Sequence, residues 1–284
     1  MGANILMVGC GDIGISLGVK LVAIGNQVWG LRRDTSRLPA TITPVTADVT
    51  ELETLVQLSS LTLDYVVVSL IPASVTDEGY RKTFVEGLDN LLKILVDSRS
   101  LKRLFFISST SVYHQTDGQW VDENSETNPD GFSGQRLLES EQLLASSGLP
   151  YTVVRFAGIY GPGRQRLIEQ VLAKQNCAEE PILYTNRIHI DDCVGFLAHL
   201  IGLHQQGQVL ESRYIGVDNE PVSLWALMRW LAQQLGIDPV AMTVTAQTRR
   251  GNKRCSNRRL LATGYQLQYA SYQQGYGKLL ASQA

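Results

Sequence analysis

The sequence lacks the features that mark disulfide-rich, zinc-binding, membrane-spanning and nucleic-acid-binding proteins. It has four cysteines in 284 residues and no C-x-x-C pair, which argues against a disulfide framework or a zinc site and fits a reducing compartment. No apolar run reaches the length of a membrane span, and no basic region precedes the first apolar run, so we expect neither a membrane anchor nor a signal peptide. The 25 basic and 27 acidic residues leave a net charge of −2, which indicates no nucleic-acid or membrane partner. We therefore predict a soluble cytoplasmic protein.

The order of apolar segments predicts an α/β fold. Over the first half of the chain, short apolar runs alternate with helical patterns, which is typical of a parallel sheet covered by helices on both faces. After Gly158 helical patterns dominate, with short strand candidates near Ile188 and Tyr214. We predict a doubly wound parallel sheet over residues 1–160 and a smaller α/β lobe over 161–284. The expected strands of the sheet are 4–8, 28–31, 42–45, 64–70, 103–107 and 151–156, and the expected helices are 15–22, 78–97 and 134–145.

A glycine-rich turn near the start of the chain is the most informative motif. Gly9, Gly11 and Gly14 have G-x-G-x-x-G spacing, directly after the first predicted strand and before a predicted helix. Gly9 permits a tight turn, Gly11 lets the backbone approach a pyrophosphate, and Gly14 lets the helix pack closely on the strand. The N-terminus of the helix, with Asp12 and Ile13, then offers N–H groups and a partial positive charge to the phosphates. The first part of the chain is therefore predicted to be a dinucleotide-binding Rossmann domain.

Two further motifs follow predicted strands. The stretch Ser108–Tyr113 (Ser-Ser-Thr-Ser-Val-Tyr) follows the fifth strand, and Tyr160–Gly163 (Tyr-Gly-Pro-Gly) follows the sixth; shorter matches are Ile188–Asp192 and Asn219–Ser223. With the glycine turn, these motifs resemble the extended short-chain dehydrogenase/reductase superfamily, in the branch named for NAD-dependent epimerases and dehydratases. The resemblance spans nearly the whole chain. It implies an NAD(P)-binding Rossmann fold, a C-terminal substrate lobe, and hydride transfer on a small alcohol or carbonyl compound, possible substrates including nucleotide sugars.

The resemblance also implies a set of catalytic side chains, of which only some are present. The serine that binds the substrate oxygen falls on Ser109, whose hydroxyl can both donate and accept. The family's tyrosine and the lysine four residues later are absent, because no Tyr-x-x-x-Lys occurs between Ser109 and Tyr151. Tyr113 and Tyr160 lie in motifs at strand ends and are the candidate phenols, although packing also explains both; we take Tyr113 as the catalytic candidate. His114, which follows Tyr113, is a further candidate for proton transfer, but it begins a polar loop.

The helix predicted at 134–145 leaves two registers open for the missing pair. In one register, Phe132 and Arg136 occupy the Tyr and Lys positions; in the other, anchored on Glu141, these positions hold Ser133 and Leu137. Phenylalanine cannot exchange a proton, and arginine stays charged. Three explanations remain: another residue transfers the proton, the protein binds cofactor without catalysis, or the site runs a different reaction.

The end of the second predicted strand favours NADP over NAD. An acidic residue at this position bonds the ribose 2′-OH of NAD, whereas an arginine accommodates the 2′-phosphate of NADP. Here Arg32 and Arg33 follow Leu31, and a guanidinium pairs with phosphate through two hydrogen bonds. The resemblance adds further cofactor-binding residues. These are Asp48 and Val49 at the adenine, Ser69, Leu70 and Ile71 near the ribose, Ser108 in the motif after the fifth strand, and Phe156 at the end of the sixth strand.

Two polar clusters have alternative explanations. His189 with Asp191 and Asp192 fits a helix N-terminus better than a metal site, so we predict no metal. Three explanations compete for the basic cluster: a solvated surface, a pocket for the phosphates of an anionic substrate, or a nucleic-acid patch. The cluster is made of Arg249, Arg250, Lys253, Arg254, Arg258 and Arg259. The negative net charge and the lack of interleaved aromatic residues argue against nucleic acid.

Two functions of different classes follow from these observations. The first is an NADP-dependent oxidoreductase or epimerase that acts on a small-molecule substrate. The second is a non-catalytic NADP-binding redox sensor or regulator, which the missing tyrosine favours. Related proteins pair through the helices that here span 78–97 and 134–145, so we also expect a homodimer.

Overall fold

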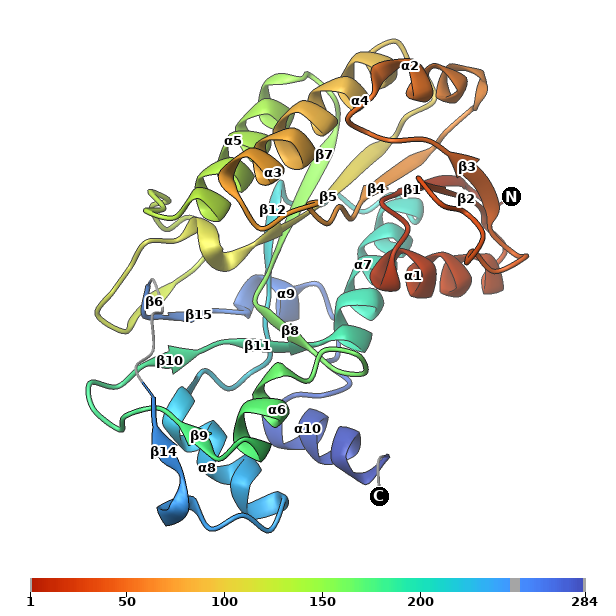
Figure 1. Cartoon of the computed structure of the whole chain (residues 1–284). Helices are drawn as coiled ribbons and strands as arrows, with labels where there is room; N and C mark the ends of the chain where they lie inside the picture. The colour runs from red at the N-terminus through yellow and green to blue at the C-terminus, as the bar shows by residue number, and fades with distance from the viewer. Residues whose placement is uncertain (1, 246–250, 283–284) are drawn as a thin grey trace. The chain divides into compact units, whose positions relative to one another are not determined.

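A computed structural model of the chain describes residues 2–245 and 251–282. The chain forms two compact units, and each is made of several segments. The first unit contains Met1–Val112, Asn128–Arg155 and Val194–Tyr214, and the second contains Tyr113–Thr127, Phe156–Cys193 and Ile215–Ala284. Figure 1 shows the elements by label and by their position along the chain. None of the helices within the described residues is long and apolar enough to cross a bilayer.

The first unit is built on a seven-stranded sheet in the order β12-β7-β5-β4-β1-β2-β3. β1 pairs in parallel with both β2 and β4, and the pairs β2–β3 and β4–β5 are also parallel. This confirms the predicted doubly wound sheet, whose strand order reverses at β1 and so opens a crevice beyond the carboxyl ends of β1 and β4. The strands are β1 (Asn4–Val8), β2 (Gln27–Arg32), β3 (Thr43–Thr46), β4 (Tyr65–Val68), β5 (Arg103–Ser109), β7 (Tyr151–Phe156) and β12 (Arg213–Gly216).

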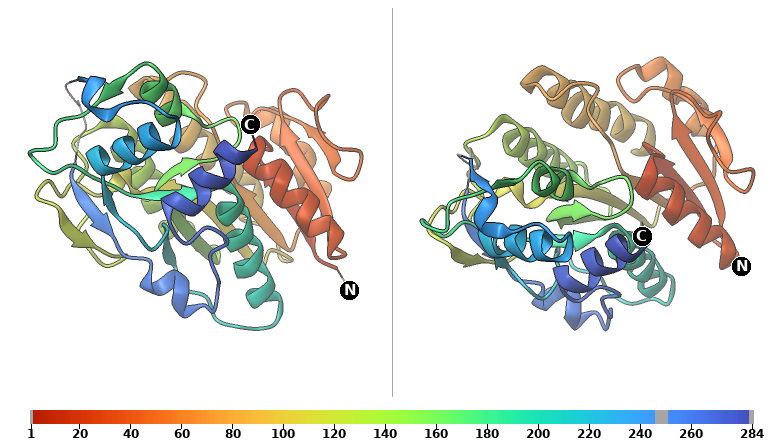
Figure 2. Two further views of the ribbon diagram at one scale, coloured as in Figure 1. Left: turned by 90° about the horizontal axis from the view of Figure 1, so that it is seen from below. Right: turned by 60° about the horizontal axis from the view of Figure 1, so that its bottom comes forward.

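Helices cover both faces of this sheet. α1 and most of α7 lie on one face, and α4 and α5 lie on the other (Figures 1 and 2). The apolar face expected for residues 78–97 is confirmed, because Leu88, Leu91, Leu92 and Leu95 are all buried. The helices and turns of this unit are α1 (Asp12–Ala23), α2 (Leu52–Leu55), η1 (Val56–Ser60), α3 (Asp77–Tyr80), the π-helical η2 (Arg81–Glu86), α4 (Gly87–Leu95), η3 (Thr110–Val112), α5 (Phe132–Ser146) and α7 (Ile190–Gln205).

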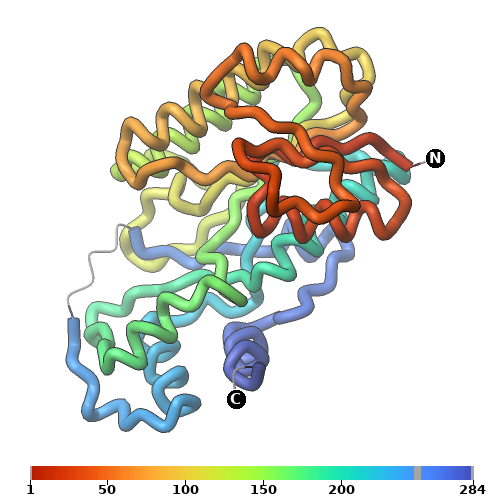
Figure 3. Tube along the Cα trace, turned by 45° about the vertical axis from the view of Figure 1, so that its right-hand side comes forward, coloured from red at the N-terminus to blue at the C-terminus, as the bar shows by residue number. Residues whose placement is uncertain are grey.

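The second unit has its own core between helices. Leu227, Met228 and Leu231 of α8 are fully buried beside Tyr160, Val171 and Tyr276. Trp225 and Trp230 are partly buried and pack against this cluster. The tube in Figure 3 shows α10 close to end-on, with α8 nearby in the same unit. The elements of this unit are β6 (Gln119–Val121), β8 (Gly158–Tyr160), α6 (Arg166–Leu172), β9 (Gln175–Asn176), β10 (Tyr184–Thr185), β11 (Arg187–His189), β13 (Val222–Ser223), α8 (Leu224–Gln234), η4 (Pro239–Ala241), β14 (Thr243–Val244), β15 (Lys253–Cys255), α9 (Arg258–Ala262) and α10 (Tyr272–Ala281).

The division of the chain is more interleaved than a single break after residue 160. The segment Tyr113–Thr127 belongs to the second unit because its strand β6 pairs with β15. The segment Val194–Tyr214 returns to the first unit, and the short strand expected near Tyr214 is β12, an edge strand of the main sheet. A short apolar run does not reveal which sheet it joins, so the sequence pattern alone placed it in the lobe.

Candidate functional site

The turn after β1 requires glycine at its first position. Gly9 has φ +76°, a left-handed conformation, and a Cβ there would lie 2.4 Å from the Ser69 carbonyl oxygen. The N–H groups of Gly9 and Cys10 both donate to the Leu31 carbonyl, at 3.0 and 3.1 Å. The Gly11 N–H donates back to the Gly9 carbonyl at 2.7 Å. The turn is therefore tied to the ends of β2 and β4, which flank β1 in the sheet.

The other two glycines leave space for different reasons. A Cβ on Gly11 would make only ordinary van der Waals contacts, with Gly9 O and the Ile71 side chain at 3.9 Å, so the protein leaves that side of Gly11 uncrowded. A Cβ on Gly14 would lie 3.4 Å from the Gly9 carbonyl oxygen and 3.5 Å from Cys10 Sγ. Gly14 therefore permits the close packing of α1 on the turn, and α1 directs its N-terminal end at the open side of the loop.

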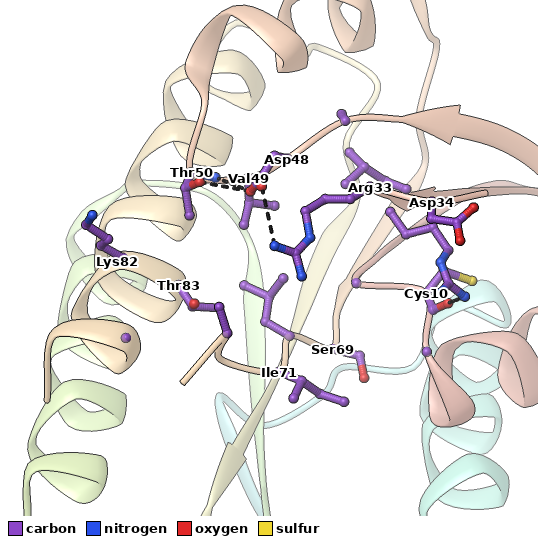
Figure 4. A pocket seen from close by; sticks show the side chains of 18 of the residues that line it. Cys10, Arg33, Asp34, Asp48, Val49, Thr50, Ser69, Ile71, Lys82 and Thr83 are labelled. Carbon is purple, nitrogen blue, oxygen red and sulfur yellow. Dashed lines mark hydrogen bonds and ion pairs between the residues drawn. The ribbon is translucent and has the colours of Figure 1, made fainter. Parts of the chain in front are cut away.

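A cavity of about 560 Å³ lies in front of this turn, and all of its lining residues belong to the first unit (Figure 4). Its walls are the glycine turn, the chain after β2, β3 and β4, and the first turns of α3 and η2. A volume in this range suits a cofactor-sized ligand. The predicted cofactor residues in the lining are Gly9, Gly11, Arg32, Arg33, Asp48, Val49, Ser69, Leu70 and Ile71.

Five predicted cofactor residues lie outside this lining. Asp12, Ile13 and Gly14 form the first turn of α1, where Asp12 is exposed and Ile13 is buried. Ser108 directs its hydroxyl to Glu141, at 2.6 Å, so a cofactor contact of Ser108 is left to its backbone. Phe156 belongs to the second unit, where it is buried. Its ring packs so closely on Gly216 that a Cβ on that residue would lie 2.2 Å from it. Their roles at the cofactor stay predictions.

The two arginines at the end of β2 are held differently. Arg32 donates from Nη1 to the Cys10 carbonyl at 3.2 Å, which fixes its guanidinium beside the glycine turn. Arg33 extends across the cavity toward Asp48, with 3.9 Å between Nη1 and Oδ2 (Figure 4). Hydrogen bonds from the Ser36 side chain and from the Ser36 N–H, the latter at 2.9 Å, lower the pKa of the Asp34 carboxyl. Two cations therefore line the cavity at the end of β2, and one oxygen of the neighbouring Asp34 carboxylate already accepts a hydrogen bond.

The wall opposite the glycine turn was not predicted. Glu78, Gly79, Lys82 and Thr83 line the cavity from α3 and the π-helical turn η2. Gly79 is required there because a Cβ would lie 2.4 Å from the Ser74 carbonyl oxygen. The sequence signal was a glycine inside a helical pattern, which marks a close approach of backbone. π-helical turns occur frequently at functional sites.

The thiol in the glycine turn is not a nucleophile. Cys10 is fully buried, and burial raises the pKa of its thiol to about 11. The thiolate, which is the reactive form, is therefore rare at neutral pH. The Cys10 carbonyl accepts a hydrogen bond from Arg32, and the residue forms part of the cavity lining.

The end of β5 carries the predicted substrate-binding serine. Ser109 is half-buried and its Oγ accepts from the Ser111 N–H at 3.1 Å, so the hydroxyl keeps its own proton as a donor. Tyr113, in the second unit, is buried and donates its hydroxyl to the Asp122 carbonyl at 2.8 Å. This bond supports a packing role for Tyr113, and its catalytic role stays a prediction that the geometry does not favour.

Behind Ser109 lies a buried ion pair. Glu141 of α5 accepts from Ser108 and from Arg155 of β7, whose Nε lies 3.0 Å and whose Nη2 lies 2.5 Å from its carboxylate oxygens. The Glu141 and Arg155 side chains are 4% and 3% exposed, so the pair is almost completely removed from water. It ties α5 to the carboxyl ends of β5 and β7.

This ion pair orients α5. Since Glu141 faces β5, the helix face that it shares with Leu137 and Ser133, four and eight residues earlier, turns toward the strand ends. Leu137 is buried, in agreement. Phe132 and Arg136 turn toward α3 instead: Phe132 packs edge-on against Tyr80 with ring centroids 5.5 Å apart, and Arg136 pairs with Asp77 at 2.8 Å.

The remaining polar clusters lie in the second unit. Asp191 and Asp192 begin α7, as predicted, and the Asp191 N–H donates to His189 Nδ1 at 3.2 Å. Asp192 is buried and accepts from Tyr265, Gln268 and Tyr269. Among the residues that the structure describes, no group of three or more His, Cys, Asp and Glu side chains could hold a metal. In the basic cluster, Arg249 and Arg250 lie outside the described residues, and Arg254 lies over the rings of Trp120 and Tyr184, at 5.1 and 4.9 Å from their centroids.

Comparison with known proteins agrees with the glycine turn, the cavity and the sheet. The model of the NAD dependent epimerase/dehydratase family matches residues 5–214. The chain belongs to the NAD-dependent epimerase/dehydratase family. A solved structure from Methylobacillus flagellatus that carries the same family name is 41% identical, with a TM-score of 0.84 over 100% of this chain and 99% of that one. UDP-glucose 4-epimerase from Thermus thermophilus, solved with NAD, is 19% identical with a TM-score of 0.81 over 98% of each chain, which shows the shared fold alone.

Curated relatives of this family member match over shorter stretches. Short-chain dehydrogenase/reductase family 42E member 1 of Danio rerio is 26% identical over 54% of this chain and 45% of its own length. An uncharacterized UDP-glucose epimerase of Bacillus subtilis (strain 168) is 29% identical over 42% of this chain and 40% of its own length. The matched stretch thus spans less than half the length of these relatives.

Proposed function

We propose that this protein binds NADP in the cavity of its first unit and carries out hydride transfer on a small alcohol or carbonyl substrate, with nucleotide sugars as a candidate class. The observation that carries the proposal is the glycine turn with its cavity: Gly9 is forced into a left-handed conformation, and Gly11 leaves its open side to the cavity. No side chain other than hydrogen fits the turn at Gly9, and the N-terminus of α1 adds a positive potential. The residues present therefore fit a dinucleotide.

The preference for NADP rests on the end of β2. Arg32 and Arg33 both line the cavity, and Arg32 is held by the Cys10 carbonyl. Planar guanidinium groups bind a phosphate through paired, charge-assisted hydrogen bonds, whereas a 2′-hydroxyl is bonded best by a carboxylate. Asp34, the nearby acid, already accepts from the Ser36 N–H. The epimerase from Thermus thermophilus was solved with NAD, so the preference for NADP proposed here rests on Arg32 and Arg33 of this chain alone.

A bound nicotinamide would supply or take the hydride, and the protein would orient the substrate. Ser109 at the end of β5 keeps an O–H donor for a substrate oxygen. The buried Glu141–Arg155 pair holds α5 against the same strand end. We propose that the family's tyrosine and lysine positions are held by Ser133 and Leu137, on the face of α5 that Glu141 turns toward β5. Neither side chain can relay a proton at neutral pH, so proton transfer would need another group.

The absence of a phenol on that face favours a second candidate, a non-catalytic NADP-binding sensor. Turnover distinguishes the two functions. NADPH oxidation can be measured over a panel of carbonyl substrates from the loss of the nicotinamide absorbance. We expect turnover in wild type that falls by about tenfold or more in Ser109→Ala, because the variant loses a hydrogen-bond donor to the developing oxyanion. Tight NADPH binding with no turnover on any substrate, or full turnover in Ser109→Ala, would contradict the proposed reaction.

We also propose a cytoplasmic homodimer. All four cysteines are free and buried, which supports a reducing compartment. The helices expected to pair, α4 and α5, lie side by side on one face of the sheet (Figure 1). Light scattering at micromolar concentration is expected to give twice the chain mass of 31.3 kDa; the mass of a single chain would remove the dimer.

A further inference from the structure

Among the described residues that line the cavity, Arg33 and Asp48 form an ion pair between distant parts of the chain. The two groups are 3.9 Å apart, at the outer limit of an ion pair, and the Arg33 side chain is 69% exposed. Such a pair is weak and easily exchanged, because water screens it and the long arginine side chain loses entropy when it is held. Arg33 can therefore leave Asp48 for a better anion.

Asp48 is fixed, in contrast to its partner. One carboxylate oxygen, Oδ1, accepts from both the N–H and the hydroxyl of Thr50, at 3.0 and 2.9 Å. The backbone N–H of Asp48 donates to Thr54 Oγ1 at 3.0 Å. The other oxygen, Oδ2, faces Arg33 (Figure 4). Asp48 is thus a stationary negative charge in the cavity, and its position does not depend on Arg33.

Arg32 forms no ion pair among the described residues, although the nearby Asp34 carboxylate interacts with its charge. Its guanidinium is held by the neutral carbonyl of Cys10 at 3.2 Å. A neutral acceptor positions the cation without opposing its charge, whereas the fixed Asp48 carboxylate partly offsets the charge of Arg33. The two arginines therefore offer unequal attraction to an incoming phosphate.

We propose that Asp48 is a specificity-determining residue: as the internal counter-ion of Arg33, it limits how strongly the site prefers a 2′-phosphate over a 2′-hydroxyl. This inference rests on the proposed function. A ligand with a 2′-hydroxyl leaves the Arg33–Asp48 pair in place. A ligand with a 2′-phosphate must draw Arg33 away from Asp48 and bind near the fixed carboxylate, so part of its attraction to Arg33 is lost.

Asp48→Asn tests the inference because asparagine removes the charge and keeps an oxygen for Thr50. With dissociation constants measured by calorimetry, we expect the NADP⁺/NAD⁺ affinity ratio to rise about 3–10-fold in the variant, from the size of charge interactions near a protein surface. Any change in a contact of Asp48 with the adenine affects both cofactors alike and leaves this ratio unchanged. Glu78→Gln is the matched control, since Glu78 also lines the cavity but pairs with Lys82 at 3.9 Å. Its NADP⁺/NAD⁺ affinity ratio should stay within about twofold of wild type, because the ion pairs of Glu78 are with Arg81 and Lys82 and not with Arg33.

The role of Arg33 is tested by combining the changes. In a variant that already carries Arg33→Ala, the further change Asp48→Asn should no longer raise the NADP⁺/NAD⁺ affinity ratio, because Asp48 acts on this ratio only through its ion pair with Arg33. Arg33→Ala alone should weaken NADP⁺ binding less than Arg32→Ala does, which keeps the inference testable should Asp48→Asn fail to fold.

Each alternative result has a distinct meaning. An unchanged ratio in Asp48→Asn, or an equal loss of both cofactors, overturns the counter-ion role while wild-type NADP⁺ binding still supports the proposed function. Asp48→Asn could also raise the NADP⁺/NAD⁺ affinity ratio equally in the presence and absence of Arg33. That result overturns the counter-ion role as well, since the Asp48 carboxylate would then act on the phosphate directly. If wild type binds neither cofactor, the proposed function itself fails.

Discussion

Replacing Glu141 with alanine is expected to lower the free energy of unfolding by about 3–5 kcal/mol, the usual cost of removing one partner of a buried ion pair. The change leaves the Arg155 guanidinium in a buried position without this carboxylate, and it removes the acceptor of the Ser108 hydroxyl. Arg155 is 2% exposed as a residue, so water cannot replace the lost charge without opening the packing of α5 on the sheet. Urea unfolding, followed by circular dichroism, measures the effect.

Glu139→Ala is the control for this prediction. Glu139 lies on the same helix and pairs with Arg136 at 2.8 Å, but its side chain is 45% exposed. Its removal should change the unfolding free energy by less than about 1 kcal/mol. Glu141→Gln, which keeps the shape of the side chain, should lower the unfolding free energy by an amount between those of Glu141→Ala and Glu139→Ala. Equal effects of Glu141→Ala and Glu139→Ala would show that the buried pair does not hold α5 in place.

Gly9→Ala is expected to destabilise the protein by at least about 2 kcal/mol and to weaken dinucleotide binding by about tenfold or more. A non-glycine residue at φ +76° is strained, and the new Cβ would lie 2.4 Å from the Ser69 carbonyl oxygen, so the turn or the end of β4 must move. Either movement displaces the N-terminus of α1, which begins at Asp12 directly after the turn. Thermal unfolding and calorimetric titration measure the two effects.

A second glycine provides the control. Gly202 lies in α7, and a Cβ there meets nothing within 4 Å. Gly202→Ala should leave cofactor binding unchanged and raise stability by up to about 1 kcal/mol, since alanine is the better helix former. Wild-type stability and binding in Gly9→Ala would show that the turn does not need glycine for either purpose.

The parts of the site that follow local chain geometry were predictable from the sequence. A glycine turn between a strand and a helix fixes where phosphates bind, and the residues after β2 and β4 reach the same edge because parallel strands end together. Nine predicted residues accordingly line one cavity, among them Gly9, Arg32 and Asp48.

The parts that depend on packing between distant segments were not predictable in this way. The π-helical turn that brings Lys82 and Thr83 to the cavity interrupts a helix whose sequence pattern is continuous. Ser108 and Ser109 are adjacent in sequence, yet Ser108 turns inward to Glu141 because neighbouring residues of a strand face opposite sides. Which serine meets the buried ion pair depends on α5, and the sequence left the register of α5 open.

The most direct test of the proposed cofactor site is a calorimetric titration of wild type and Arg32→Ala with NADP⁺ and NAD⁺. We expect one site per chain in wild type, about tenfold or tighter binding of NADP⁺ than of NAD⁺, and loss of this preference in Arg32→Ala. Absence of binding of either cofactor, tighter binding of NAD⁺, or an unchanged NADP⁺ affinity in Arg32→Ala would contradict an NADP site at the end of β2.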